Sequence, residues 1–263
     1  MEDAPSSERK RPRGIYLLPN LFTTGAMFAG FYAIIASIGG RYSEAALAVF
    51  VAGILDGLDG RVARLTGTQS DFGVQYDSLS DLVSFGVAPA LVMYTWSLSS
   101  LAAYGSLWGK VGWAAAFIYA ACAALRLARF NTQVGVVDKR YFQGLASPAA
   151  AVLCMSFVWT VEKFERWSGI DVQFVTPVIA ISAGLLMVSN VRYFSFKAWP
   201  RSDRVPFIVG PIALLVIVAL AVDPPRVLFG IAVLYVLSGP VMTLWGLRRT
   251  RVQRAQRGER GAE

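Results

Sequence analysis

Acidic side chains cluster in one stretch of the chain, residues 55–81, which reads LDGLDGRVARLTGTQSDFGVQYDSLSD. Both flanks of this stretch are strongly apolar, and an acid at the edge of hydrocarbon costs on the order of 2.5–3.5 kcal/mol by insertion scales. Several carboxylates in such a place repel one another unless a cation lies between them. The acids that recur at regular spacing are Asp56, Asp59, Asp77 and Asp81. Because placing these acids beside hydrocarbon costs free energy, we expect them to form a functional site.

The spacing predicts that these acids lie on facing sides of two helices. The first helix would carry a polar arc of about 140°, in which small residues stand beside the acids. The members of this arc are Asp56, Asp59, Gly60, Ala63 and Arg64. On the second helix, residues four apart step by only about 40° and form a stripe. The members of the stripe are Gly73, Asp77 and Asp81. Two antiparallel helices can therefore direct both sets into one cleft.

The residue types restrict the chemistry of this cleft. The chain contains no histidine, which excludes Ser-His-Asp and Cys-His catalysis and any histidine metal ligand. Oxygen ligands alone favour a hard cation such as Mg²⁺ or Mn²⁺, and a cluster of this size is large enough for two ions. The two cysteines, Cys122 and Cys154, lie in apolar segments. For them we expect packing roles and neither a disulfide nor a zinc site.

The composition predicts an all-α, polytopic integral membrane protein. Hydrophobic residues make up 55% of the 263 positions, and the mean hydropathy is +0.50. Apolar stretches of sufficient length indicate about eight transmembrane helices. They cover approximately 21–38, 44–64, 74–98, 108–129, 146–164, 173–194, 205–222 and 227–247. The charged N-terminus has no apolar core of its own, so no cleavable signal peptide is expected.

The positive charges predict the orientation of these helices. If residue 1 is cytoplasmic, 20 lysine and arginine residues fall on the cytoplasmic side and 5 on the other. This asymmetry predicts that both termini and the acidic stretch face the cytoplasm. Residues 1–13 read as a disordered basic tail, and the charged cytoplasmic tail, 248–263, is expected to fray.

The acidic stretch also carries a resemblance. Its pattern is Asp56-x-x-Asp59-Gly60-x-x-Ala63-Arg64, then eight residues, then Gly73-x-x-x-Asp77-x-x-x-Asp81. This pattern is identified as the signature of the CDP-alcohol phosphotransferase family. Further stretches resemble the bacterial, membrane-integral phosphatidylserine synthases of that family, and the resemblance covers roughly residues 15–197. These stretches are LPNLFT, ALRLARFNTQ, FQGLASPAAA and SNVRYFSFK.

The resemblance implies transfer of the phosphatidyl group from CDP-diacylglycerol to L-serine, giving phosphatidylserine and CMP. It implies that the four acids are ligands of one or two divalent ions, Mg²⁺ or Mn²⁺, or stand within reach of one, and that Asp81 is the general base. It also implies a six-helix membrane core within residues 14–204, so that 205–247 would be two additional C-terminal helices. We expect a multi-pass protein of the inner (cytoplasmic) membrane. Members of the family are commonly homodimers, and no nucleic-acid partner is expected.

The same resemblance implies two sets of binding residues. CDP-diacylglycerol would contact the non-acidic signature residues and two polar residues at the start of the first span, although helix capping is an alternative for the latter pair. This set is Gly60, Ala63, Arg64, Gly73, Asn20 and Thr23. Of the residues that close the fourth and sixth spans, at least one arginine is expected to bind the serine carboxylate or the donor phosphate, with anchoring by the positive-inside rule as the alternative. This set is Arg126, Arg129, Asn131 and Arg192.

Other interpretations of the acidic stretch stay open. Another family member would use a different acceptor, such as inositol phosphate, glycerol phosphate or choline. A cation-coupled transporter would also keep acids within the membrane, but it needs no adjacent Gly-x-x-Ala-Arg sequence.

Two charged residues near the signature receive simpler roles. Asp71 is expected to cap the third helix, and Arg61 to lie at the interface or steer phosphate.

Overall fold

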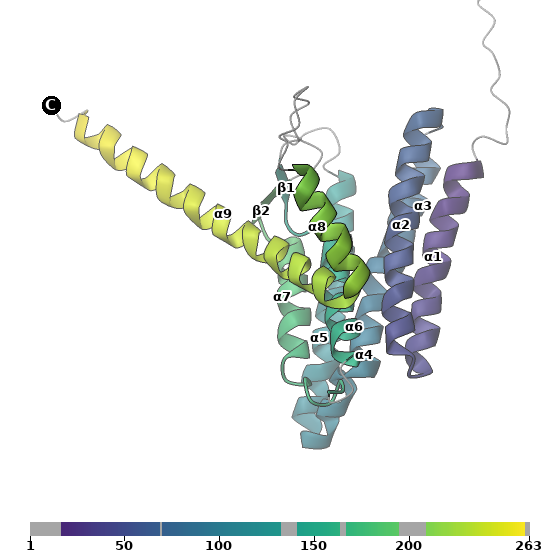
Figure 1. Cartoon of the computed structure of the whole chain (residues 1–263). Coiled ribbons are helices and arrows are strands. Elements are labelled where there is room, and N and C mark those ends of the chain that lie inside the picture. The colour runs from purple at the N-terminus through teal and green to yellow at the C-terminus, as the bar shows by residue number, and fades with distance from the viewer. Residues whose placement is uncertain (1–16, 69, 133–140, 164–166, 195–208, 261–263) are drawn as a thin grey trace, which may run out of the picture.

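The computed structural model describes residues 17–68, 70–132, 141–163, 167–194 and 209–260 (Figure 1). Over these residues the chain is an all-α helical bundle, with one antiparallel pair of three-residue strands at one end. The predicted basic tail, 1–13, lies outside the described residues.

Eight helical segments correspond to the eight predicted spans. The first four are α1 (Leu17–Ile38), α2 (Tyr42–Thr66), a continuous segment of α3 (Asp71–Asp81), η2 (Leu82–Val87) and α4 (Ala88–Trp96), and α5 (Ser106–Thr132). The short 3-10 helix η3 (Leu98–Tyr104) connects the third to the fourth. The other four are α6 (Ser147–Glu162), α7 (Thr176–Val188), α8 (Val209–Val222) and α9 (Pro224–Arg260).

The lengths and hydropathies of these segments are those of a membrane protein. Four helical stretches among the described residues are long and apolar enough to cross a bilayer. They are Pro19–Ile38, Asp71–Tyr104, Ser106–Thr132 and Pro224–Thr243. The shorter helices α6, α7 and α8 are also apolar. With 25 residues α2 has the required length, and its polar arc carries the charges of the acidic stretch.

Contacts between α1 and the third segment hold the site end of the bundle together. Ser80 and Ser84 donate hydrogen bonds of 3.0 Å to the backbone carbonyls of Thr23 and Ala26, respectively. The helices approach closely at Gly30, where an added Cβ would lie 2.7 Å from the Cα of Ser84. Because any larger residue would separate the two helices at this point, Gly30 fixes the distance from α1 to the acids of α3.

A π-helical turn, η2, interrupts the third segment directly after Asp81. The sequence predicted one regular span here, 74–98, and did not indicate this turn. Pro89 has no backbone N–H to donate to the Phe85 carbonyl, and the Tyr119 hydroxyl donates to that carbonyl instead at 3.1 Å. Such turns often occur at functional sites because they reorient one side chain within a helix.

A short loop with defined ends joins α2 to α3. Gly67 closes α2 in the left-handed conformation, with φ at 62°, which favours glycine. The side chain of Ser70 accepts a hydrogen bond of 3.0 Å from the Gly73 backbone N–H and so caps α3. The prediction that Asp71 is the cap is wrong by one position. Asp71 stands in the first turn, where its negative charge interacts favourably with the positive end of the helix dipole.

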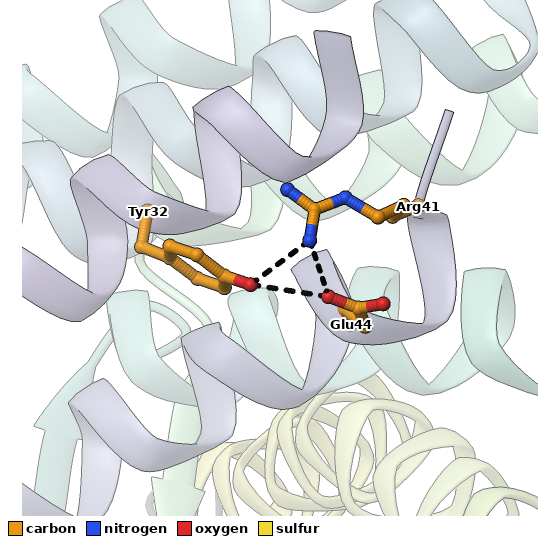
Figure 2. A network of polar contacts seen from close by, with 3 residues as sticks. All are labelled: Tyr32, Arg41 and Glu44. Atoms are coloured by element: carbon orange, nitrogen blue, oxygen red, sulfur yellow. Dashed lines mark hydrogen bonds and ion pairs between the residues drawn. The ribbon is translucent and has the colours of Figure 1, made fainter. Parts of the chain in front are cut away.

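At the other end of the bundle, a polar network spans the turn from α1 to α2 (Figure 2). Arg41 donates from Nη1 to the Tyr32 hydroxyl at 3.2 Å and to Glu44 Oε2 at 2.9 Å. The Tyr32 hydroxyl in turn donates to Glu44 Oε2 at 3.1 Å. All three side chains are exposed, so the network orders the turn more than it stabilises the fold.

A second charged cluster lies between the end of α6 and the turn from α8 to α9. Asp223 accepts from Lys163 Nζ at 3.0 Å and from Arg226 Nη1 at 3.0 Å. The hydrogen bond from Lys163 lowers the pKa of the Asp223 carboxyl below its usual value. The cluster therefore connects the C-terminal helices to the six-helix part of the bundle.

The C-terminal helices differ from each other in packing. Helix α8 has no buried residue, whereas α9 buries Ala232 and Val236 against the rest of the bundle. Beyond the bundle α9 continues as one long helix that projects away from it (Figure 1). The expectation that the charged tail frays from Arg248 is wrong, since the helix continues to Arg260.

The strand pair corrects one predicted boundary. β1 (Tyr141–Gln143) and β2 (Arg192–Phe194) pair in antiparallel register, with Gln143 opposite Arg192. The sixth predicted span, 173–194, therefore ends too late, because its last residues belong to β2. The pair connects the start of α6 to the end of α7 at the site end of the bundle.

Candidate active site

The acids of the two helices converge as their spacing predicts. Asp56 and Asp59 project from α2, and Asp77 projects from α3. One carboxylate oxygen of each lies within 4.8 Å of the others. The carboxyl group of Asp81, one turn further along α3, contacts Asp56. Four acids from two antiparallel helices thus form one cluster.

Hydrogen bonding within this cluster is incomplete. Thr23 of α1 donates to Asp59 Oδ2 at 2.6 Å, a short bond that is typical of a charged acceptor. Asp77 Oδ1 is buried and has no hydrogen-bond partner among the described residues. A buried carboxylate oxygen without a donor needs a compensating charge. The acids Asp56, Asp59 and Asp77 therefore fit a divalent cation, which is held by oxygen ligands at such distances.

A cavity of about 350 Å³ opens beside the acids, between α1, α2 and the start of α3. The residues that line it are Pro19, Asn20, Thr23, Asp59, Gly60, Ala63, Arg64, Thr68, Ser70, Gly73, Val74 and Asp77. All six residues predicted to contact CDP-diacylglycerol are in this set. Arg61 is exposed and does not line the cavity.

Small residues and one arginine shape the cavity. An added Cβ at Gly73 would lie 3.7 Å from Asn20 Oδ1, so glycine leaves space between α3 and α1. The exposed Arg64 folds back along α2, where its Nε donates to the Gly60 carbonyl at 2.7 Å. This bond holds the positively charged guanidinium of Arg64 along the cavity wall, where it can bind an anionic ligand.

Arg126 of α5 lies near the Asp81 end of the cluster. Its Nη1 donates to the Ser147 hydroxyl at 2.9 Å, and its charge interacts with that of Asp81. The Nε atom is buried and has no hydrogen-bond partner among the described residues. A guanidinium with a buried, unused donor beside acids is well suited to hold an anionic group of a substrate.

The other predicted acceptor-binding residues are placed differently. Arg129 donates to Gln143 at 2.7 Å, to Asn190 at 2.8 Å and to the Val188 carbonyl at 3.4 Å, which holds β1 to the end of α7. Asn131 donates to Ser78 at 2.9 Å and so joins α5 to α3. Arg192 lies in β2, but its side chain is outside the described part of the chain. Among the side chains described, Arg126 is the one of this set that faces the acids.

Sequence reasoning missed one residue of this end of the site. Ser147 lies in the FQGLASPAAA stretch but was not recognised as the partner of Arg126. The pairing depends on how α6 packs against α5, which the spacing of residues along the chain does not indicate.

The amino-acid sequence is similar to those of several known proteins. A CDP-diacylglycerol–serine O-phosphatidyltransferase of Helicobacter pylori is 40% identical over 183 residues, which are 70% of this chain and 74% of the relative. A protein of the same name from Methanocaldococcus jannaschii is 40% identical over 145 residues, 55% of this chain and 61% of the relative. An archaetidylserine synthase of Methanothermobacter thermautotrophicus is 32% identical over 196 residues, 74% of each chain.

The family comparison covers the residues that build the site. The model of the CDP-alcohol phosphatidyltransferase family matches residues 16–189, from the start of α1 to the end of α7. This range includes all four acids, every residue that lines the cavity, and Arg126 with Ser147. The chain therefore belongs to the CDP-alcohol phosphatidyltransferase family.

Proposed function

We propose that the protein transfers the phosphatidyl group from CDP-diacylglycerol to L-serine, with phosphatidylserine and CMP as products. The observation that carries the proposal is the convergence of four acids beside a cavity at one end of an apolar bundle. The relatives named CDP-diacylglycerol–serine O-phosphatidyltransferase support it. Such a site lets the acyl chains stay in the bilayer while the headgroup reacts at its surface.

The donor would bind at the cavity. Asp56, Asp59 and Asp77 would hold Mg²⁺ or Mn²⁺, and with Asp81 nearby the cluster could take two ions. When bound, the metal supplies charge neutralisation for the pyrophosphate. The polar residues Asn20 and Thr23 at the start of α1 would contact the cytidine or its ribose. Arg64 would contact a phosphate.

The acceptor would bind beside Arg126, near the Asp81 end of the cluster. The guanidinium would pair with the serine carboxylate through the donors that Ser147 leaves unused. This places the serine hydroxyl near Asp81, which would take its proton as the bond from serine oxygen to phosphorus forms. The bond from that phosphorus to the CMP oxygen breaks in the same step, and CMP leaves.

An acceptor panel tests this proposal. Purified protein with labelled CDP-diacylglycerol and Mg²⁺ or Mn²⁺ should release CMP with serine at a kcat/KM at least on the order of 10²-fold above that with the other acceptors. The panel contains inositol phosphate, glycerol phosphate and choline, together with ethanolamine, which differs from serine only by the missing carboxylate. Equal or faster turnover with any of them would contradict serine as the acceptor. No metal-dependent CMP release with any acceptor would contradict the reaction itself.

We further propose that the site faces the cytoplasm, in the inner membrane, and that the protein forms a homodimer as the family resemblance implies. The lysine and arginine distribution, 20 against 5, supports the orientation. In a variant without Cys122 and Cys154, a membrane-impermeant maleimide applied to intact cells should label Ser99→Cys. Asp71→Cys should be labelled only after the membrane is permeabilised. Both positions are exposed, and the reverse pattern would contradict the orientation.

A further inference from the structure

The two halves of the third segment, α3 and α4, are held in the bundle to different degrees. Helix α4 buries six of its nine residues, and at its end Trp96 Nε1 donates to Glu162 Oε1 of α6 at 2.6 Å. Helix α3 buries one of its eleven residues, Ser80. A change in the helix between the two halves would therefore move α3 and leave α4 in place.

The π-helical turn η2 lies between these halves and sets the rotation of α3 about its axis. A π-helical turn holds about one residue more than an α-helical turn, and one residue corresponds to about 100° of rotation. With this rotation, one carboxylate oxygen of Asp77 lies within 4.8 Å of oxygens from Asp56 and Asp59. If η2 were a regular α-helix on the same α4, it would turn Asp77 and Asp81 away from the acids of α2.

The carbonyl group of Phe85, within η2, has its donor from another helix. In a regular α-helix the backbone N–H of residue 89 would donate to it, but Pro89 has no N–H and its ring clashes with a carbonyl four residues earlier. The Tyr119 hydroxyl of α5 donates to this carbonyl at 3.1 Å. Because Phe85 and Tyr119 are both buried, bulk water cannot replace this donor.

Close packing holds Tyr119 in place. On the side of α7, an added Cβ at Gly184 would lie 3.2 Å from the Cα of Tyr119. On the side of η2, an added Cβ at Gly86 would lie 3.1 Å from the Cβ of Ala123, one turn further along α5. Helix α5 is therefore fitted between α7 and η2, and this packing brings the Tyr119 hydroxyl to the Phe85 carbonyl.

We propose that Tyr119 is a positioning residue for the acids of α3. By holding the Phe85 carbonyl it maintains η2, and η2 gives α3 the rotation that brings Asp77 and Asp81 to the acids of α2. Tyr119 does not line the cavity, so it would act through the helix and not through contact with a substrate. The expected kinetic effects rest on the proposed function, in which these acids hold the metal and accept the proton.

Removal of one hydroxyl tests the role of Tyr119. Tyr119→Phe should lower kcat about 10- to 100-fold, because small displacements of reacting groups have effects of this size. The Tm should also fall, since a buried carbonyl loses its donor. Tyr42→Phe is the matched control, because the Tyr42 hydroxyl also donates at 3.1 Å to a carbonyl of the third segment, that of Thr95, at the end remote from the acids. In this control kcat should stay within about twofold of wild type.

A double variant separates the rotation of α3 from the satisfaction of a buried carbonyl. Pro89→Ala with Tyr119→Phe supplies a backbone N–H that donates to the Phe85 carbonyl in a regular α-helix, so the Tm should recover. The regular helix lacks the extra residue of η2, so kcat should stay low. The upward shift of Tm on addition of Mg²⁺ or Mn²⁺ should also stay smaller than in wild type, because Asp77 has left the cation site.

Three results would overturn the proposal. They are a kcat within about twofold of wild type in Tyr119→Phe, an equal loss of kcat in Tyr42→Phe, and recovery of kcat together with Tm in the double variant. If Tyr119→Phe does not fold, the double variant decides alone. If the wild-type protein releases no CMP with any acceptor, the proposed function fails on its own, and the metal-dependent shift of Tm decides the role of Tyr119. The absence of that shift in wild type would overturn both proposals.

Discussion

Replacement of Asp56, Asp59 or Asp77 by Asn should reduce turnover by on the order of 10³-fold or more, because each change removes a negative ligand from the proposed cation site. The three carboxylate oxygens lie within 4.8 Å of one another, and Asp77 Oδ1 has no hydrogen-bond partner among the described residues. An amide oxygen carries no charge, and its NH₂ group can donate toward the neighbouring acids. The variants should therefore fold but lose their affinity for the cation.

The measurement has two parts, so that metal binding is read separately from activity. Thermal unfolding of the purified protein should shift upward as Mg²⁺ or Mn²⁺ is added, and the shift should be lost in the three variants. Asp71→Asn is the matched control, because Asp71 is an exposed acid of the same helix α3 that does not line the cavity. Full activity in excess EDTA, or in Asp56→Asn, would contradict a metal-dependent reaction.

Asp81→Asn should separate chemistry from binding. Asp81 lies one turn beyond Asp77, faces Arg126 and contacts Asp56. If Asp81 takes the proton of the acceptor hydroxyl, its loss should lower kcat by roughly 10²- to 10⁴-fold, the usual contribution of positioned proton transfer. Binding of CDP-diacylglycerol should change much less, since the amide keeps the shape of the side chain. The losses in kcat and kcat/KM should then be similar.

Donor affinity decides between two roles for Asp81. Isothermal titration of CDP-diacylglycerol into the wild-type and Asp81→Asn proteins, each with saturating metal, measures it without turnover. Asp77→Asn is the comparison, because its donor affinity should fall together with its activity. Should Asp81→Asn lose donor binding to the same extent, Asp81 is a metal ligand and another group must accept the proton.

The sequence predicted the parts of the site that depend on helix geometry. Asp56 and Asp59 are three residues apart, and Asp77 and Asp81 are four apart, so any regular helix places each pair on one face. Apolar spans predicted the eight helical segments because burial in hydrocarbon requires a minimum length. The first inference uses helical periodicity and the second uses the length of apolar stretches. Both depend only on local sequence, and the structure confirms them.

Features that depend on distant contacts could not be predicted in this way. The cap of α3 at Ser70, and not at Asp71, depends on where the loop from Gly67 turns. The choice among the arginines depends on partners from other elements. Arg129 is occupied by acceptors from β1 and from the residues that follow α7, whereas Arg126 keeps a buried donor beside the acids. Sequence spacing alone treats the two arginines as equivalent.

The contacts of Thr23 restrict how the site can evolve. Its hydroxyl donates to Asp59, its backbone carbonyl accepts from Ser80 of α3, and its side chain lines the cavity. If Thr23 contacts the donor as proposed, a substitution there that favours a different nucleotide would also remove the hydrogen bond that Asp59 accepts. Donor preference and metal affinity would then be inherited together through this residue. Lineages that change one are expected to carry compensating changes in the other.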